Sequence, residues 1–387
     1  MTLAFVNGRI LTPTGFVAGH ALRVDGAHIV DVLSANDARL ANLERVDVSG
    51  RLLLPGYIDT QVNGGGGVLF NDAPTVESIR RIGAAHARFG TTGFLPTLIS
   101  DDLDVVARAI RAVDDAIEAG VPGVLGIHVE GPFISSAKRG VHDARHFLAL
   151  DDSSIALLTS LRRGRTLLTL APEVAPPALL QRLADAGVVL AAGHSNATAT
   201  DVEIARAHGL RGFTHLFNAM SPLTAREPGV VGAALADEDA YCGLIVDGYH
   251  VDPRVLRLVL RLKRADRLML VTDAMPPVGT PDRSFELQGR RIRVEDGHCV
   301  DEQGTLAGTA LDMGRAVRNA VALLQIAPEA AVAMASTVPA QFLGLGATHG
   351  QLTPGARADF VVTDPNLHPL ETWIGGRRCA TAEGDAP

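Results

Sequence analysis

Four polar residues lie at or near the ends of apolar, strand-length segments, and their side chains are typical of a hydrolytic metal site. They are Glu130, His194, His215 and Asp273. A glutamate and two histidines are a common ligand set for catalytic zinc, which keeps a further position open for water. Such a metal lowers the pKa of its water from ~15.7 to roughly 7 and polarises a carbonyl. Asp273 is then a candidate to accept the water proton and pass it to a leaving amine.

The elements that must position these residues form a regular alternation of short apolar runs and helical segments. Fully apolar strands between helices are typical of a parallel sheet covered on both faces. Eight repeats over this length predict a (β/α)8 TIM-like barrel of the α/β class, with an open doubly wound sheet as the alternative. The expected strands are Leu52–Thr60, Thr92–Leu98, Val124–Gly131, Leu167–Pro172, Val188–His194, Gly212–Phe217, Gly243–Val246 and Leu268–Asp273. Because functional residues gather at the carboxyl ends of barrel strands, the four residues should converge.

The two ends of the chain differ from this alternation and read as short strands with turns. Neither end has enough apolar residues to bury a core alone, so we expect them to pair. Residues 1–53 and 349–387 are therefore predicted to form a small β-sandwich domain, and residues 54–348 the catalytic barrel. A β-hairpin insertion is expected near residues 284–299, where Gly289 and Gly297 mark turns.

The bulk composition is typical of a globular enzyme that acts on a small molecule. The net charge is −8 without a dense Lys/Arg patch, which argues against a nucleic-acid partner. No apolar run reaches the roughly 18 residues of a membrane span, and no signal peptide is recognisable. The three cysteines are scattered and predict neither a disulfide framework nor a thiolate metal site. These features together predict a cytoplasmic protein without a membrane partner.

Several longer motifs surround the candidate residues and are far more specific than single side chains. They are Pro55–Asp59 (PGYID), His128–Phe133 (HVEGPF), Lys138–His142 (KRGVH), Gly193–Ala197 (GHSNA), His215–Met220 (HLFNAM), Asp247–His250 (DGYH) and Thr272–Met275 (TDAM). With them, the sequence resembles the N-acetylglucosamine-6-phosphate deacetylases of the amidohydrolase superfamily over nearly its whole length. HLFNAM followed by Arg226-Glu227-Pro228-Gly229 is the most specific of these signals.

The resemblance implies a reaction and roles for individual residues. The reaction is hydrolysis of N-acetyl-D-glucosamine 6-phosphate to D-glucosamine 6-phosphate and acetate, in amino-sugar catabolism and cell-wall sugar recycling. Glu130, His194 and His215 would bind the metal, Asp273 would be general base and then general acid, and His142 would polarise the acetamide carbonyl. Further residues would bind the substrate, namely Val141, Asn218, Ala219, Arg226, His250, Leu306, Ala307 and Gly308. The resemblance also implies a homodimer in which Arg226 reaches the neighbouring site.

Gln61 and Asn63 stand where the superfamily usually has a His-x-His motif that binds a second metal. Neutral amides are poor ligands for a divalent transition metal, so we expect one ion per subunit. Zinc is the expected ion, with iron, manganese and cobalt as alternatives, and Gln61 and Asn63 remain a candidate weak second-metal or substrate region. His128 shares a strand face with Glu130, and we assign it a supporting or structural role over direct ligation.

Two other functions compete with deacetylation. One is a cyclic amidase of the dihydroorotase or hydantoinase type, which should carry His-x-His and lack HLFNAM. The other is a catalytically inactive barrel used for binding, against which the intact ligand set and Asp273 argue.

Overall fold

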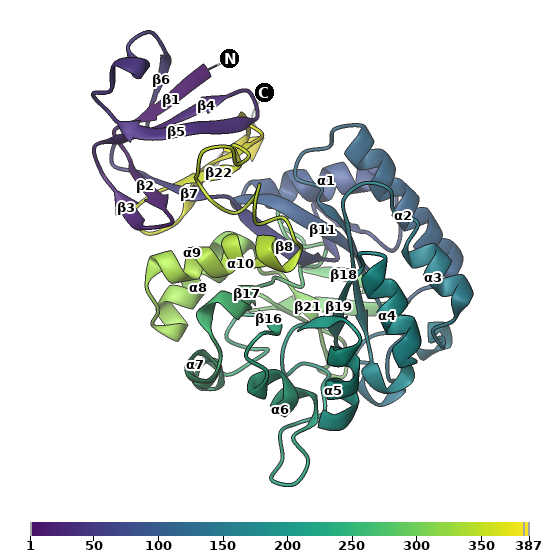
Figure 1. Cartoon of the computed structure of the whole chain (residues 1–387). Coiled ribbons are helices and arrows are strands. Elements are labelled where there is room, and N and C mark those ends of the chain that lie inside the picture. Colours follow the sequence, from purple (N-terminus) through teal and green to yellow (C-terminus); the bar gives the residue numbers. More distant parts are fainter. Residues whose placement is uncertain (1, 382–383, 386–387) are drawn as a thin grey trace.

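The computed structural model describes residues 2–381 and 384–385, and its centre is a parallel eight-stranded sheet that curves into a barrel (Figure 1). The last strand does not pair with the first over their length. Instead, Val62 forms a bridge with Ala274, and the backbone N–H groups of Asn63 and Gly64 both donate to the Ala274 carbonyl at 2.9 Å. In spatial order the strands are β8 (Tyr57–Val62), β11 (Thr91–Ile99), β12 (Gly126–Glu130), β13 (Arg165–Leu170), β14 (Val189–Ala192), β15 (Leu210–Phe213), β16 (Tyr241–Leu244) and β17 (Leu268–Leu270). The predicted barrel is thus confirmed.

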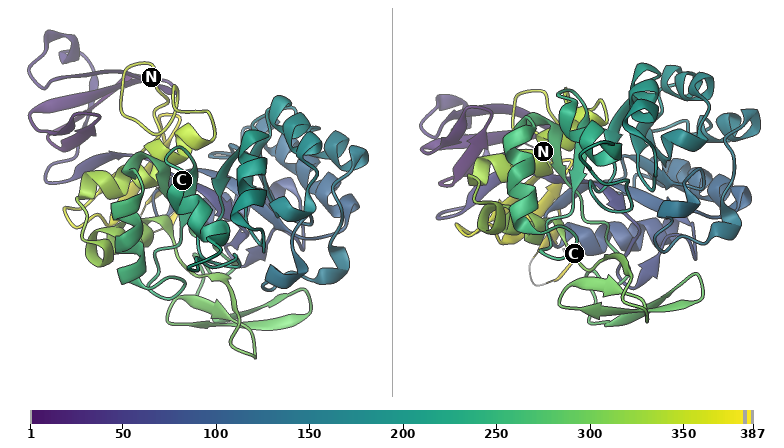
Figure 2. Two further views of the ribbon diagram at one scale, coloured as in Figure 1. Left: turned by 60° about the horizontal axis from the view of Figure 1, so that its bottom comes forward. Right: turned by 90° about the horizontal axis from the view of Figure 1, so that it is seen from below.

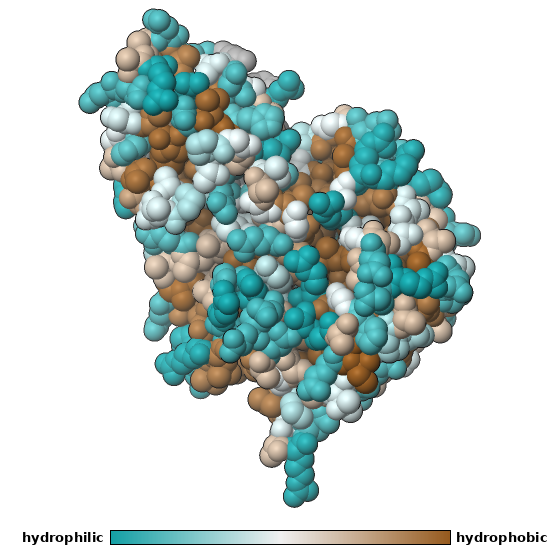
Figure 3. Space-filling view, in the orientation of Figure 1, coloured by the Kyte–Doolittle hydropathy of each residue, from teal (hydrophilic) through white to brown (hydrophobic). Residues whose placement is uncertain are grey.

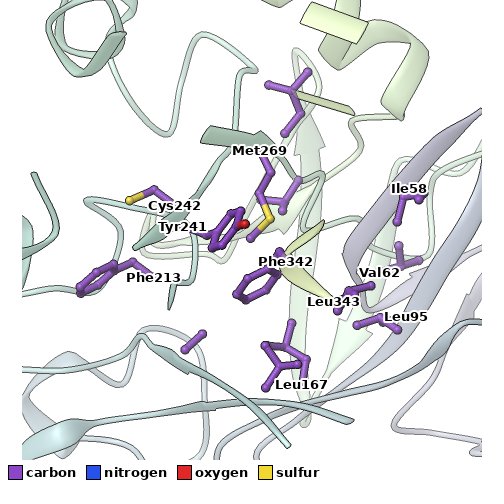
Figure 4. Packing of buried hydrophobic residues seen from close by; sticks show 14 of the residues in the cluster. Ile58, Val62, Leu95, Leu167, Phe213, Tyr241, Cys242, Met269, Phe342 and Leu343 are labelled. Carbon is purple, nitrogen blue, oxygen red and sulfur yellow. The ribbon is translucent and has the colours of Figure 1, made fainter. Parts of the chain in front are cut away.

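Helices cover the outside of the barrel. They are α1 (Val76–Ala87), α2 (Leu103–Glu118), α3 (Asp152–Leu158), α4 (Pro177–Asp185), α5 (Ala199–Ala207), α6 (Gly229–Ala236), α7 (Pro253–Leu262), α8 (Met313–Leu324), α9 (Pro328–Ala335) and α10 (Thr337–Phe342). In α2, Val106, Ile110 and Val113 recur at helical spacing and are buried, so one face of the helix joins the core. Figure 4 shows side chains of several barrel strands around Phe342 of α10 and the following Leu343. Within the described residues, no helix is both long and apolar enough to cross a membrane.

Both ends of the chain meet in a small β-domain beside the barrel (Figure 1, purple and yellow). One sheet has the order β5 (His28–Ser34), β4 (His20–Asp25), β1 (Thr2–Val6) and β6 (Glu44–Asp47). The other has the order β25 (Gly384–Asp385), β24 (Arg377–Thr381), β23 (Pro369–Ile374), β22 (Phe360–Thr363), β7 (Leu52–Pro55), β2 (Arg9–Thr12) and β3 (Gly15–Val17). Phe5 lies edge-on to Phe360 and Trp373, with ring centroids 4.8 and 4.9 Å away, so strands of both chain ends share one core. Residues 1, 382–383 and 386–387 of the expected domain lie outside the described residues.

The apolar run Leu52–Thr60, predicted as one strand, is two strands that belong to different sheets. β7 pairs with β22 and β2 in the small domain, whereas β8 pairs with β11 in the barrel. The change occurs at Gly56, where a Cβ atom would lie 2.1 Å from the Thr92 Oγ1. Only glycine permits this close approach, and an apolar pattern alone does not reveal it.

The predicted hairpin insertion is present but belongs to a larger element. β18 (Ser284–Leu287) and β19 (Arg290–Glu295) form the hairpin, and β20 (His298–Val300) and β21 (Leu306–Thr309) extend it to four strands. We call these four strands the inserted sheet; Figure 2 shows it in light green, below the barrel. A short ribbon of β9 (Gly64–Gly65) and β10 (Val68–Leu69) follows the first barrel strand.

Candidate active site

Three buried side chains converge at the carboxyl ends of β12, β14 and β15. The Glu130 Oε1 lies 3.2 Å from the His194 Nε2 and 3.0 Å from the His215 Nε2. The two imidazole Nε2 atoms are 3.2 Å apart. Three ligand-type atoms from three strands thus point at one another, as the ligands of a metal ion do.

The backbone at these strand ends is in an uncommon conformation. The φ angles of His194, His215 and Asp273 are 49°, 33° and 51°, in the left-handed region that residues other than glycine seldom adopt. Each such residue costs of the order of 1–3 kcal/mol and persists where the surrounding structure imposes it. The backbone therefore turns sharply after each of the three strands. These turns place the three side chains at the cluster.

Hydrogen bonding prepares this cluster for a cation. The His194 Nδ1–H donates to the Lys138 carbonyl at 2.9 Å, so Nε2 is the ring nitrogen that faces Glu130. Burial opposes ionisation of Glu130, but hydrogen bonds from both imidazoles hold the pKa of its carboxyl well below the usual range. A charged carboxylate beside two imidazole nitrogens fits a divalent ion of the zinc type.

Gln61 and Asn63 act as hydrogen-bond donors toward the carboxylates. The Gln61 Nε2 lies 3.1 Å from both Glu130 oxygens and 3.1 Å from the Asp273 Oδ1, and the Asn63 Nδ2 donates to that same Oδ1 at 2.6 Å. The two amides therefore hold Asp273 beside the cluster. Burial and then repulsion from Glu130 raise the pKa of Asp273. A cation between the carboxylates would relieve this repulsion.

His142 lies next to His194, and the centroids of the two imidazole rings are 4.3 Å apart. Its Nδ1 accepts hydrogen bonds from the Ser100 hydroxyl at 2.7 Å and from the Ser100 backbone N–H at 3.3 Å. Burial and the neighbouring His194 lower the pKa of His142 well below its ordinary value, so its ring is neutral.

The cluster opens into a cavity of about 480 Å³, which lies within the range of small-molecule sites. Most of the residues predicted to bind substrate line it, namely Val141, Asn218, Ala219, His250, Leu306 and Gly308. The His250 Nδ1 is 2.6 Å from the Asp247 Oδ2, which leaves its Nε2 available to a ligand. Ala307 is fully buried instead, in the small core under the inserted sheet.

Arg226 is exposed and does not line the cavity of its own chain. It lies on a loop, residues 222–228, that extends away from the barrel beside α6, and the tip of this loop is hydrophilic (Figures 1 and 3). Arg226 is therefore not part of the cavity wall of its own subunit.

Lys138 lines the cavity and was not among the predicted site residues. Among the described residues of the cavity wall, it is the only lysine or arginine. The KRGVH motif that gave His142 also contains Lys138, but sequence alone does not tell which of its side chains faces the cavity.

His128 is bound inside the barrel, away from the ligand position. Its Nε2 lies 2.8 Å from the Thr169 Oγ1 and its Nδ1 3.3 Å from the Thr97 Oγ1. Burial lowers the pKa of His128 to about 4, so the ring is a neutral member of the barrel interior. This geometry agrees with the supporting role expected from sequence.

Comparisons with known proteins agree with this geometry. A sequence model described as the amidohydrolase family matches residues 52–380. The N-acetylgalactosamine-6-phosphate deacetylase of Shewanella sp. (strain ANA-3) is 41% identical, over 97% of this chain and 96% of that protein. The crystal structure of N-acetylglucosamine-6-phosphate deacetylase from Pasteurella multocida is 35% identical, has a TM-score of 0.94, and covers 98% of this chain and 99% of its own. A mutant of the Mycobacterium smegmatis enzyme in complex with N-acetyl-D-glucosamine 6-phosphate is 31% identical with a TM-score of 0.89, covering 98% of each chain. The chain therefore belongs to the amidohydrolase family, and its full-length relatives are deacetylases of 6-phosphorylated N-acetylhexosamines.

Proposed function

We propose that this protein hydrolyses the acetamide of N-acetyl-D-glucosamine 6-phosphate to give D-glucosamine 6-phosphate and acetate. The observation that carries the proposal is the convergence of Glu130, His194 and His215 beside Asp273 in a cavity large enough for a small-molecule substrate. The deacetylase activities named for its full-length relatives support the same reaction. Such a reaction belongs to amino-sugar catabolism.

One divalent ion, with zinc as the expected metal, would be held by Glu130, His194 and His215. When bound, it supplies a Lewis acid that polarises the acetamide carbonyl and lowers the pKa of water. Asp273, held by Gln61 and Asn63, accepts a proton from the attacking water as the new C–O bond forms. Its raised pKa suits the reverse transfer, in which the carboxyl returns that proton to the amine as the C–N bond breaks.

His142 has the complementary task of stabilising negative charge. Its Nδ1 is an acceptor for Ser100, so the proton of its neutral ring is on Nε2. An Nε2–H group directed at the acetamide oxygen stabilises the oxyanion that develops there. In other hydrolases, one such hydrogen-bond donor raises kcat by about 10²–10³-fold.

The 6-phosphate needs a cation in a chain of net charge −8. Two candidates exist. Lys138 lines the cavity of its own subunit, and Arg226 stands on the exposed loop at residues 222–228. We propose that the protein is a homodimer in which Arg226 of one subunit completes the phosphate site of the other. Unpaired, scattered cysteines are in keeping with a cytoplasmic location.

A second candidate substrate is N-acetyl-D-galactosamine 6-phosphate, because the Shewanella relative at 41% identity is named for that sugar. The two substrates differ only in the configuration at one ring carbon, and the proposed acetamide chemistry is the same for both.

The test is to supply the zinc-loaded protein with both 6-phosphorylated sugars, with unphosphorylated N-acetylglucosamine and with dihydroorotate, and to follow acetate, free amine and ring opening. We expect acetate and amine from one or both phosphorylated sugars, with a far lower kcat/KM for N-acetylglucosamine. Ring opening of dihydroorotate would indicate a cyclic amidase instead, and inactivity toward all four would favour a binding protein.

A further inference from the structure

We propose that Gln288, at the tip of the first hairpin of the inserted sheet, is a positioning residue that fixes the ring of His142. The proposal rests on the role of His142 in the proposed function. It assigns to the inserted sheet a part in catalysis, although Gln288 itself does not line the substrate cavity.

The side chain of Gln288 joins the two segments that hold His142. Its Nε2 donates to the Ser100 carbonyl at 2.8 Å, and its Oε1 accepts from the Asp143 backbone N–H at 2.9 Å. Ser100 is the residue that hydrogen-bonds the His142 ring, and Asp143 directly follows His142 in the chain. One amide therefore spans the end of β11 and the loop of His142, with a donor and an acceptor each used once.

Gln288 occupies a turn position that a glutamine does not favour. Gln288 and Gly289 form the two-residue turn between β18 and β19, with φ angles of 49° and 77°. Such a turn favours Asn, Asp or Gly at its first position. The next hairpin of the same sheet follows this preference, since Asp296 and Gly297 occupy its turn with φ angles of 48° and 95°. A glutamine in this place gains nothing for the turn, and its two hydrogen bonds give a reason for its presence.

A small apolar core holds the three polar residues in register. Ile99, Val141 and Leu287 each directly precede one of Ser100, His142 and Gln288. All three are buried and belong to a single hydrophobic cluster, which also contains residues of the inserted sheet and of the barrel rim, namely Leu69, Met275, Ile292, Cys299 and Ala307. The inserted sheet is thus packed against the barrel rim through this cluster, which gives the Gln288 amide a fixed support.

The consequence for His142 is a defined tautomer. A backbone N–H can only donate, so the Ser100 N–H requires a lone pair on the His142 Nδ1 and places the ring proton on Nε2. Gln288 holds Ser100 through the Ser100 carbonyl oxygen, and it holds the loop of His142 through the backbone N–H of Asp143. Loosening either bond lets the ring rotate or change tautomer, and the acetamide oxygen then loses its donor.

Two variants separate this role from a general contribution to folding. Gln288→Asn suits the left-handed turn better, but its amide is one methylene shorter and cannot span both partners. Gln288→Glu keeps the shape and the acceptor for Asp143 but replaces the donor to the Ser100 carbonyl with a carboxylate oxygen. The matched control is Asp296→Asn, in the corresponding turn of the next hairpin.

For both Gln288 variants we expect kcat to fall about 10- to 100-fold with KM within about twofold, because the oxyanion contact is made in the transition state. The melting temperature should be unchanged or raised for Gln288→Asn, and Asp296→Asn should match the wild type. A kcat within twofold of wild type in both Gln288 variants would overturn the proposal. So would an equal loss of kcat in Asp296→Asn, since that would show only disturbance of the sheet.

A spectroscopic measurement keeps this test separate from that of the proposed function. In zinc-loaded protein labelled with ¹⁵N-histidine, the His142 signals are identified by their absence in His142→Gln. We expect an Nε2-protonated ring in the wild type, and a mixture of tautomers in both Gln288 variants. If the wild type releases acetate but the variants keep the wild-type tautomer, the Gln288 proposal fails alone. If the wild type releases no acetate from either phosphorylated sugar, the proposed function fails whatever the tautomer.

Discussion

Glu130 and Asp273 are both carboxylates at strand ends, yet their surroundings prepare them for different tasks. Two imidazoles hold the pKa of Glu130 low, as a permanently charged ligand requires. Burial and the charge of Glu130 raise the pKa of Asp273, as a group that takes up and returns a proton requires. Opposite shifts in a pair of neighbouring carboxyls commonly mark such a division of roles.

Replacing Asp273 by Asn should therefore remove the proton acceptor and leave the site otherwise intact. We expect kcat to fall by about 10²–10⁴-fold, the usual contribution of a positioned base. The zinc content and the melting temperature should stay close to those of the wild type, since Asp273 is not among the three proposed ligands. A kcat near that of the wild type would remove Asp273 from the mechanism.

Replacing Lys138 by Ala tests the phosphate contact within one subunit. The His194 ring is held by the backbone carbonyl of Lys138, so the substitution keeps that bond while removing the ammonium group. We expect KM for the 6-phosphorylated sugar to rise about tenfold or more, with little change for unphosphorylated N-acetylglucosamine. Lys138→Arg, which keeps the charge, should retain most of the affinity. Equal effects on both sugars would rule out the phosphate role.

At the residue scale, the sequence is enough to predict site residues whose side chains have distinctive chemistry and whose position at the end of a strand follows from the apolar pattern. Glu130, His194, His215 and Asp273 are of this kind, and the structure brings all four together. It does not suffice for Lys138 or Gln288, because their relevance depends on which way a loop or a hairpin directs the side chain.

At the scale of elements, the join between the first and last barrel strands depends on a buried carboxyl group. Asp59 of β8 accepts a hydrogen bond from the Thr272 backbone N–H at 3.3 Å and is also bonded to the Thr272 hydroxyl. Burial raises the pKa of Asp59 to about 7. The folded state thus favours the protonated form of Asp59 relative to an unfolded chain, where an aspartate has a pKa of about 3.9.

The stability of the fold should consequently carry a pH-dependent contribution from Asp59. Because the folded pKa lies above the unfolded pKa of an acid, this contribution is full below about pH 4 and is lost as the pH rises through about 7. Asp59→Asn stays neutral throughout. Relative to wild type, the variant should therefore become more stable between about pH 4 and pH 8, measured as the difference in urea midpoints at each pH. A difference that does not change with pH would show that Asp59 has no such raised pKa.

The order of strands and helices was predictable because buried parallel strands are continuous apolar runs separated by amphipathic helices. The point at which one sheet ends and another begins was not predictable in the same way. No polar residue interrupts the run from Leu52 to Ile58, yet the chain passes from one sheet to the other at Gly56, which packs closely on Thr92. The turns at Gly289 and Gly297 predict the hairpin near residues 284–299, whereas β21 follows a further turn at Gly304 and lies outside the predicted bounds.

At the scale of the whole molecule, the proposed homodimer would make the active site a property of two subunits, because Arg226 on its exposed loop would complete the phosphate site of the partner. Arg226→Ala should raise KM for the phosphorylated sugar, as is expected for Lys138→Ala. The melting temperature of the protein should not fall, because Arg226 is exposed. In the proposed dimer, Lys138 belongs to the same subunit as the cavity, whereas Arg226 comes from the other subunit.

Mixing Arg226→Ala with Asp273→Asn tests this directly. In a mixed dimer, one site has Asp273 from the first chain and Arg226 from the second, and is therefore native. Random exchange of subunits should restore about one quarter of the wild-type sites, whereas either variant alone stays impaired. Restoration should be absent if Arg226 serves its own subunit, and a monomer by ultracentrifugation would contradict the arrangement altogether.

In the proposed reaction, a single ion at Glu130, His194 and His215 enables hydrolysis of a 6-phosphorylated N-acetylhexosamine. The most direct measurement is the rate of acetate release from N-acetyl-D-glucosamine 6-phosphate, with the galactosamine epimer in parallel, while zinc is returned stepwise to metal-free protein. We expect no activity without metal and a linear rise that ends at about one ion per chain. Activity that persists in the metal-free protein, or that keeps rising to two ions per chain, would contradict the account.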